Sequence, residues 1–170
     1  MQMKRVPIDT ILPLYYVGPD FEEGPLPCVI YLALSAKESL TVDPFNQVVV
    51  PLLNHPIRII SVDLPFHGEG FLSVEGMSYW AKALEKGEDI LSDFLDKLEA
   101  SLLKLFALVP PTRTVVAGLS RGGFLASHLA ARMSEISSLL AFAPLTRLDL
   151  IKELTPYVSL PTVEKLSLFS

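Results

Sequence analysis

The sequence has very little cysteine, and its basic residues form no cluster. The single thiol, Cys28, excludes a framework of internal disulfides and offers no zinc-ligand spacing. Acidic residues outnumber lysine and arginine by 19 to 14, which gives a net charge of −5, and the acids are scattered along the chain. We therefore expect no nucleic-acid partner, because the basic surface that nucleic acids require is missing. Nothing in the pattern indicates a metal or a cofactor.

Long hydrophobic runs are also missing. No stretch approaches the ~18 apolar residues that a membrane-spanning helix needs. The longest candidate, residues 102–109, is interrupted by Lys104 and ends at Pro110. Two cations near the N-terminus are not followed by an apolar segment, so a signal peptide is not predicted. These absences predict no membrane partner and a cytoplasmic location.

What the sequence does contain is a high proportion of apolar residues. Hydrophobic residues make up 50% of the 170 residues and charged residues 19%, and the mean hydropathy is +0.42. This length suits one domain with a substantial core and is short for two. The apolar excess indicates either a parallel sheet that is buried on both faces, or a chain that lacks part of its covering.

Short apolar runs alternate with amphipathic stretches along the chain. The runs predict strands at residues 10–17, 28–34, 57–62, 114–117 and 138–143. The stretches predict helices at residues 43–53, 73–87, 88–107 and 122–133, with two shorter helical patterns at 147–154 and 162–169. Pro13 places the first strand toward a sheet edge, and residues 35–39 are expected to form a loop. The alternation predicts a single α/β domain over residues 1–170, with a mostly parallel sheet and helices on both faces.

A Gly-x-Ser-x-Gly motif stands between the strand at 114–117 and the helix at 122–133. In this strand–turn–helix context the serine, Ser120, becomes an exposed nucleophile. Gly118 and Gly122 have no Cβ atom, so they allow a sharp turn and close packing on both sides of the serine. Ligands of parallel sheets bind at the carboxyl ends of the strands, where four loops are expected to converge: residues 34–39, 63–70, 118–122 and 143–146.

Three segments together resemble the α/β-hydrolase family. They are Gly118-Leu119-Ser120-Arg121-Gly122-Gly123, Asp63-Leu64-Pro65-Phe66-His67-Gly68-Glu69-Gly70 and Ala141-Phe142-Ala143-Pro144. Their order and intervals match the family's middle portion over residues 11–145. Within the family the chain is similar to small esterases and to catalytic domains of the dienelactone-hydrolase and prolyl-oligopeptidase type. The resemblance implies the α/β-hydrolase fold and hydrolysis of a small carboxylic ester or a related acyl substrate.

The resemblance also implies roles for individual residues. Ser120 would attack an acyl carbonyl after a histidine takes its proton, and an acid would orient that histidine. The oxyanion would receive hydrogen bonds from the backbone N–H groups of Arg121 and Ser35, with Leu34 as the next choice for the second donor. Three residues would shape the site without taking part in the chemistry: Gly118, Gly122 and His67.

The sequence departs from the family pattern at two places. The strand end at Ala33-Leu34 lacks the family's usual His-Gly. The family's triad follows the order serine, acid, histidine, but the one histidine after Ser120, His128, precedes every later acid. We therefore expect the triad acid and histidine to lie beyond these residues, with the chain truncated after about residues 146–170.

Other functions are left open by the residues themselves. An α/β-hydrolase-like domain with a vestigial elbow would bind a partner without catalysis, and its exposed sheet edge would predict a homo-oligomer. A peptidase or a thioesterase would use the same fold and the same serine, because the sequence does not mark the loops that build the acyl pocket. The side chain of Arg121 would either contact an anionic substrate group or lie at the rim of the site.

Overall fold

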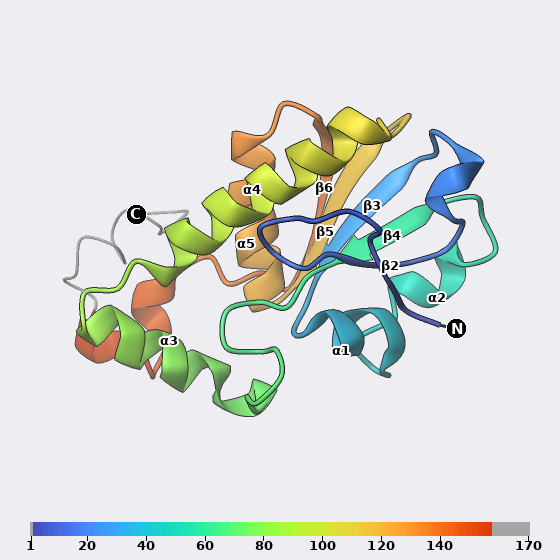
Figure 1. The fold of residues 1–170 in the computed structure, drawn as a ribbon. Coiled ribbons are helices and arrows are strands. Elements are labelled where there is room, and N and C mark those ends of the chain that lie inside the picture. The colour runs from blue at the N-terminus through green and yellow to red at the C-terminus, as the bar shows by residue number, and fades with distance from the viewer. Residues whose placement is uncertain (1, 158–170) are drawn as a thin grey trace.

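A computed structural model describes residues 2–157, and it is organised around a six-stranded sheet with the strand order β1-β2-β4-β3-β5-β6 (Figure 1). Strands β3 to β6 pair in parallel, while β1 and β2 are antiparallel additions at one side. The strands run over Lys4–Arg5 (β1), Tyr15–Val17 (β2), Cys28–Leu32 (β3), Arg58–Ser61 (β4), Thr114–Leu119 (β5) and Ile136–Phe142 (β6). The mostly parallel sheet confirms the predicted α/β class.

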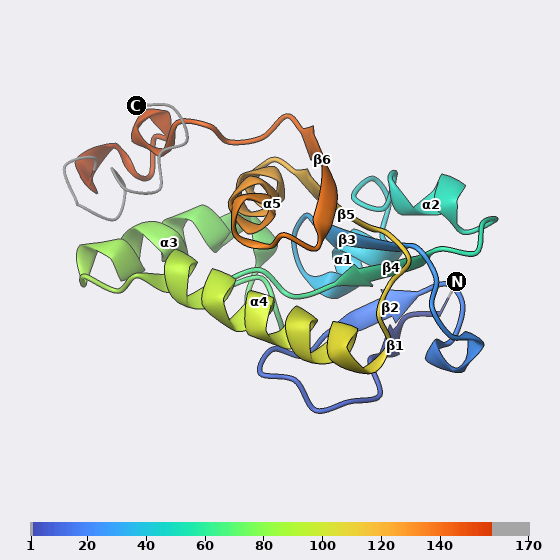
Figure 2. The ribbon, with the colours of Figure 1, turned by 90° about the horizontal axis from the view of Figure 1, so that it is seen from above.

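Helices cover both faces of the sheet, as predicted (Figure 2). One face carries α3 (Gly76–Glu85), α4 (Ile90–Leu108) and α5 (Arg121–Arg132), and the other carries α1 (Ala36–Thr41) and α2 (Val49–Leu52). Short 3-10 turns occupy Phe21–Glu23, Ser73–Glu75, Leu148–Leu150 and Thr155–Tyr157. None of the helices within residues 2–157 combines the length and the apolar composition needed to cross a bilayer. Because β3 to β6 are parallel, the segments that follow them all start at the same end of the sheet, where the carboxyl ends of these strands lie.

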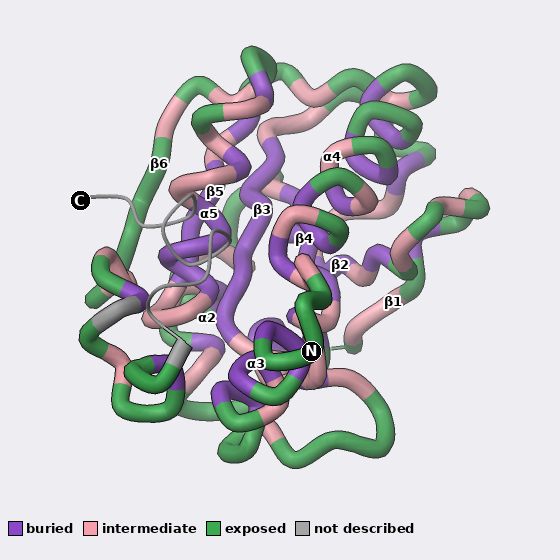
Figure 3. Tube along the Cα trace, turned by 90° about the vertical axis from the view of Figure 1, so that its left-hand side faces the viewer, coloured by how far each residue is buried: buried purple, intermediate pink, exposed green. Residues whose placement is uncertain are grey.

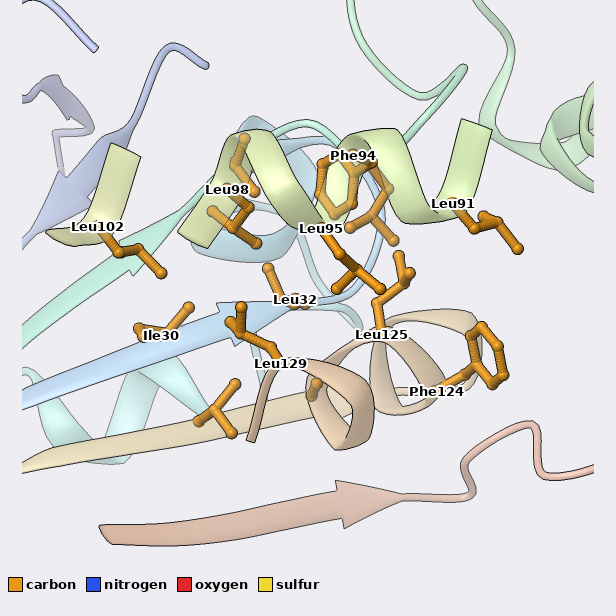
Figure 4. Packing of buried hydrophobic residues seen from close by; sticks show 14 of the residues in the cluster. Ile30, Leu32, Leu91, Phe94, Leu95, Leu98, Leu102, Phe124, Leu125 and Leu129 are labelled. Atoms are coloured by element: carbon orange, nitrogen blue, oxygen red, sulfur yellow. The ribbon is translucent and has the colours of Figure 1, made fainter. Parts of the chain in front are cut away.

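The larger core lies between α4, α5 and the sheet (Figure 4). α4 places fully buried leucines at helical spacing on its inner face: Leu91, Leu95, Leu98 and Leu102. A smaller core on the opposite face packs Leu40 of α1 and Val49 of α2 against Tyr31 and Ile59. Full burial of a leucine side chain stabilises a fold by about 1.5–3 kcal/mol. The periodicity that predicts the helix at 88–107 therefore reflects the packing of this core.

The first predicted strand, residues 10–17, is shorter than expected and does not form the sheet edge. β2 covers only three residues, because Pro13 cannot donate a ladder hydrogen bond. β1, which is too short to be predicted, pairs with β2 and takes the edge position. The predicted loop at 35–39 is instead part of helix α1, because Ser35 and Glu38 form a capping box at its start.

The helical predictions are also corrected in detail. Pro44 follows a cis peptide bond within a turn, and α2 begins only at Val49. Gly76 does not break the predicted helix but is the first residue of α3. The pattern at 147–154 forms only a short 3-10 turn, and the one at 162–169 lies outside the described residues.

β6 forms the other edge of the sheet and is far more exposed than the central strands (Figure 3). Its apolar side chains keep 40% (Leu139), 49% (Leu140) and 41% (Phe142) of their accessible surface, whereas every residue of β3 and β4 is buried. The strand contains neither a charged residue nor a proline, so nothing in it prevents pairing with another strand. The high hydropathy therefore has two sources, strands buried on both faces and an apolar edge.

Candidate active site

Ser120 lies at the sharp turn between β5 and α5. Its backbone has φ 54° and ψ −118°, a conformation that residues with a side chain rarely adopt. Three backbone hydrogen bonds hold it there: the Ser120 amide donates to the carbonyl of Phe142 (2.9 Å), and the carbonyl of Ser120 accepts from the amides of Phe124 (3.1 Å) and Leu145 (3.2 Å). The serine is thus fixed at the carboxyl edge of the sheet, where it is partly exposed.

Backbone contacts explain why glycine stands on both sides of this serine. A Cβ built on Gly118 would lie 2.3 Å from the carbonyl oxygen of Gly122. A Cβ built on Gly122 would lie 2.0 Å from the carbonyl oxygen of Leu32, at the end of β3. Both glycines therefore let the turn close and let α5 approach the sheet, which is the role that the motif predicts for them.

The first turn of α5 presents its backbone N–H groups beside Ser120. α5 begins at Arg121 and continues for 12 residues. The first N–H groups of a helix have no carbonyl partner within the helix, and the helix dipole places the equivalent of about half a positive charge at this end. The Arg121 amide thus comes from an element that stabilises negative charge, as its predicted role in the oxyanion hole requires.

The side chain of Arg121 is fixed by neighbouring segments. Its Nη1 donates to Nε2 of His67 (2.9 Å) and to the carbonyl of Ser73 (3.2 Å). His67 is 2% exposed, and its Nδ1 donates to the carbonyl of Pro65 (2.7 Å). Burial, together with the Arg121 guanidinium, lowers the pKa of His67, so its ring is neutral at pH 7 and Nε2 can accept. Both ring nitrogens are therefore engaged in hydrogen bonds, and the assignment of His67 as a residue that shapes the site stays a prediction.

The loop after β3, where the second oxyanion donor was expected, has its amides occupied. The Leu34 amide donates to Oγ of Ser39 (3.1 Å), the Ser35 amide to Oε2 of Glu38 (3.2 Å), and the Ala36 amide to Oδ1 of Asp63 (2.8 Å). The cause is the helix that replaces the predicted loop, since the N-terminal amides of α1 are capped by these side chains. The assignment of Ser35 as a donor stays a prediction, and it requires its hydrogen bond to Glu38 to open.

An open pocket of about 660 Å³ lies at the carboxyl ends of β3 and β4. Its polar lining includes Ser35, Glu38, Asp63, His67 and Ser73, and Phe71 and Leu72 add apolar surface. His67 and Ser73 also contact the Arg121 side chain, so the pocket adjoins the turn that carries Ser120. Its size suits a small organic ligand.

None of the three histidines of the sequence is placed to accept the proton of Ser120. His55 is exposed in the connector before β4, at the opposite end of the strands. His67 is engaged at both nitrogens. His128 follows Ser120 by eight residues along α5, a rise of about 12 Å, and its ring packs on Phe124 with 4.7 Å between centroids. Within residues 2–157, no three His, Cys, Asp or Glu side chains converge in a way that would hold a metal ion.

Sequence reasoning missed two side chains that adjoin the site, those of Glu38 and Ser73. The Ser-x-x-Glu pattern at 35–38 is the signature of a capping box and could have placed Glu38 at a helix start. Ser73 contacts the side chain of Arg121, 48 residues further along the chain, and a local sequence pattern cannot predict a contact over that distance.

Comparison with known proteins agrees with this architecture. The model of a family described as "Alpha/beta hydrolase family" matches residues 37–166. The fold is similar to TT1662 from Thermus thermophilus, with a TM-score of 0.68, 19% identity, and coverage of 98% of this chain and 67% of that one. It is also similar to the esterase Pf2001 from Pyrococcus furiosus, with a TM-score of 0.58, 21% identity, and coverage of 87% and 51%. No curated protein matches this sequence.

A dienelactone hydrolase-like promiscuous phosphotriesterase, P91, from metagenomic libraries shows the same likeness, with a TM-score of 0.60, 15% identity, and coverage of 89% of this chain and 63% of that one. The chain thus spans about half to two thirds of the length of these solved structures. The match to the family model includes the Ser120 turn, the loop that follows β4 and most of the residues that line the pocket. The chain therefore belongs to the alpha/beta hydrolase family.

Proposed function

We propose that this chain carries the nucleophile of a serine hydrolase that cleaves a small carboxylic ester or a related acyl substrate. The observation that carries the proposal is the backbone of Ser120, a non-glycine residue held at φ 54° between a strand and the first turn of a helix. Strain of this kind costs about 1–3 kcal/mol and is concentrated at functional sites. Membership of a hydrolase family and a fold shared with an esterase support the same class of chemistry.

In the proposed reaction, Oγ of Ser120 attacks the carbonyl carbon of the ester while a histidine accepts the hydroxyl proton. The carbonyl oxygen becomes an oxyanion and receives a hydrogen bond from the Arg121 amide; one such donor contributes about 3–4 kcal/mol to transition-state stabilisation. The bond to the alcohol breaks as the histidine returns the proton to the leaving oxygen, and an acyl-serine ester is left. Water then attacks this ester with the same histidine as base, which releases the acid and restores Ser120.

We propose that the histidine and the acid of this mechanism come from chain beyond these 170 residues. The three histidines in the sequence are exposed and remote (His55), engaged at both nitrogens (His67), or about two turns along the helix (His128). The greater length of the solved structures with this fold is consistent with such a contribution. The second oxyanion donor would be the Ser35 amide, once its 3.2 Å hydrogen bond to Glu38 opens while Glu38 keeps its shorter bonds to the hydroxyls of Ser35 and Ser73.

A non-catalytic binding domain is the second candidate, and one observation favours it. Three successive amides after β3, those of Leu34, Ser35 and Ala36, are already satisfied by side chains. A site that never stabilises an oxyanion has no need for a free donor there. The pocket beside the Ser120 turn would then bind a ligand without converting it.

Labelling with a fluorophosphonate separates the two candidates, because the probe bonds to an activated serine with loss of fluoride. The protein, in the longest form that its gene encodes, is expected to take up the probe at Ser120, and peptide mass spectrometry locates the adduct. Ser120→Ala is expected to abolish labelling, whereas Ser134→Ala, which removes an exposed hydroxyl, leaves it unchanged. An unlabelled Ser120 would refute the nucleophile and support the binding domain. Rates with p-nitrophenyl esters, acyl thioesters and peptide anilides then identify the bond that is cleaved.

A further inference from the structure

A carboxylate that the proposed reaction does not use, Glu38, joins two segments at the edge of the site. Its Oε2 accepts hydrogen bonds from the hydroxyls of Ser35 and Ser73, both at 2.6 Å. Ser35 caps α1, and Ser73 begins the 3-10 turn that leads into α3, 35 residues after Glu38. We call Ser35, Glu38 and Ser73 the Glu38 clasp.

The Glu38 clasp is continuous with the side chain next to the nucleophile. The carbonyl of Ser73 accepts from Nη1 of Arg121 (3.2 Å), which also donates to Nε2 of His67 (2.9 Å). Gly76 makes room for this junction, since a Cβ there would lie 2.4 Å from Cε1 of His67 and 2.8 Å from Nη1 of Arg121. The Arg121 side chain is thus fixed by a segment that Glu38 fixes in turn.

The charges along the Glu38 clasp favour this arrangement. Burial acts to raise the pKa of Glu38, but hydrogen bonds from Ser35 and Ser73 outweigh it and hold that pKa below its ordinary value, so the carboxylate is ionised at pH 7. Burial lowers the pKa of Arg121, yet arginine stays protonated in proteins, and nearby carboxylates favour its charged form. Ser73 therefore makes a charge-assisted hydrogen bond on each side, donating to an anion and accepting from a cation.

We propose, resting on the proposed function, that Ser73 and Glu38 are positioning residues of the hydrolytic site. They hold the Arg121 side chain, and this keeps the Arg121 backbone N–H aimed at the oxyanion beside Ser120. The anchored guanidinium and the N–H belong to one residue at the start of α5, directly after a residue at positive φ. A released side chain lets this first turn shift, and a displacement of about 1 Å at a reacting centre can slow a reaction ~100-fold.

The test is the kinetics of Ser120 inactivation by a fluorophosphonate in the longest form of the protein that its gene encodes. Ser73→Ala removes the hydroxyl bond to Glu38 and is expected to lower the maximal inactivation rate, kinact, by about 10- to 100-fold. The half-saturating probe concentration, KI, is expected to change little, since reversible binding does not use the oxyanion donor. Ser73→Thr keeps a hydroxyl and is expected to restore most of kinact. Ser78→Ala, which removes an exposed hydroxyl from α3, is expected to match the wild type.

The outcomes separate this inference from the function on which it rests. Equal kinact in Ser73→Ala and wild type, with Ser120 labelled in both, overturns the positioning role and leaves the proposed function intact; a change in KI alone does the same. A wild-type protein that does not label at Ser120 overturns both. If Ser73→Ala does not fold, Glu38→Gln takes its place with the same expected loss of kinact, and Glu85→Gln, an exposed acid of α3 outside the pocket, is its control.

Discussion

Gly122→Ala is expected to destabilise the fold strongly, through a collision between backbone and the new methyl group. The added Cβ would lie 2.0 Å from the carbonyl oxygen of Leu32 and 2.9 Å from the amide nitrogen of Ala33. Both atoms belong to the backbone and cannot rotate away. Cβ atoms in proteins essentially never lie closer than 3.0 Å to such an atom, so β3 and α5 must separate by about 1 Å, the difference between 2.0 Å and 3.0 Å. Overpacking of this severity costs about 3 kcal/mol, and alanine recovers about 1 kcal/mol through its helix propensity. The expected net loss is about 2 kcal/mol of unfolding free energy.

Gly123→Ala is the matched comparison, because it makes the same change one residue later in the same helix. Its Cβ would lie 3.0 Å from the carbonyl oxygen of Gly118 and 3.1 Å from Cβ of Pro144, so small shifts relieve it. Helix propensity offsets the remaining strain, and we expect a change within about 1 kcal/mol. Urea denaturation followed by circular dichroism measures both free energies. Equal losses in the two variants would show that the contact with Leu32 is not what requires glycine at 122.

Three further perturbations test the core, the buried histidine and the sheet edge. Leu98→Ala empties a fully buried position in α4 and is expected to lower the free energy of unfolding by about 2–5 kcal/mol. Leu103→Ala, at a side chain that is 39% exposed, is expected to lower it by less than about 1 kcal/mol. Equal losses of free energy in urea denaturation would contradict the packing of α4. Burial and the nearby Arg121 guanidinium lower the pKa of His67 in the folded chain. As the pH is lowered through about 6.5, the unfolded chain therefore binds this proton before the folded chain does, and the free energy of unfolding decreases as the pH decreases. His67→Asn, unlike His55→Asn, is expected to flatten that fall in urea denaturation between about pH 7.5 and 5.5; an unchanged slope contradicts it. The expected homo-oligomer is tested by Leu140→Lys in β6, which is expected to lower the sedimentation coefficient, measured by sedimentation velocity, to that of a monomer. A sedimentation coefficient equal to that of the wild type rules out pairing through this edge.

The parts of the site that the sequence could predict are those that depend on backbone geometry over a few residues. Glycine is required at 118 and 122 because of contacts within the turn and with the end of β3. The Gly-x-Ser-x-Gly motif indicates this requirement in the sequence itself. The long helix over 88–107 was predictable for a similar reason, since its buried leucines repeat at the period of the helix itself.

The parts that the sequence could not predict depend on contacts between distant segments. The Arg121 guanidinium ends between His67 and Ser73, 54 and 48 residues away, and its position follows from how the segments that carry these two residues lie against the start of α5. The occupied amide of Ser35 follows from a helix that lacks apolar periodicity and is recognisable only by its cap. Interpretation of residues 35–39 as a loop was wrong for that reason, and it left the second oxyanion donor looking free.

The hydrogen bond between the Ser120 amide and the Phe142 carbonyl ties the Ser120 turn to an edge strand of the sheet. Phe142 is the last residue of β6, an edge strand paired on one side only within the described residues. The ends of such strands fray more readily than central strands, and each fraying event removes one of the restraints that hold Ser120 at positive φ. The rigidity of Ser120 is thus inherited from a strand 22 residues further along the chain. Any segment that pairs along β6 will stiffen the serine without touching it.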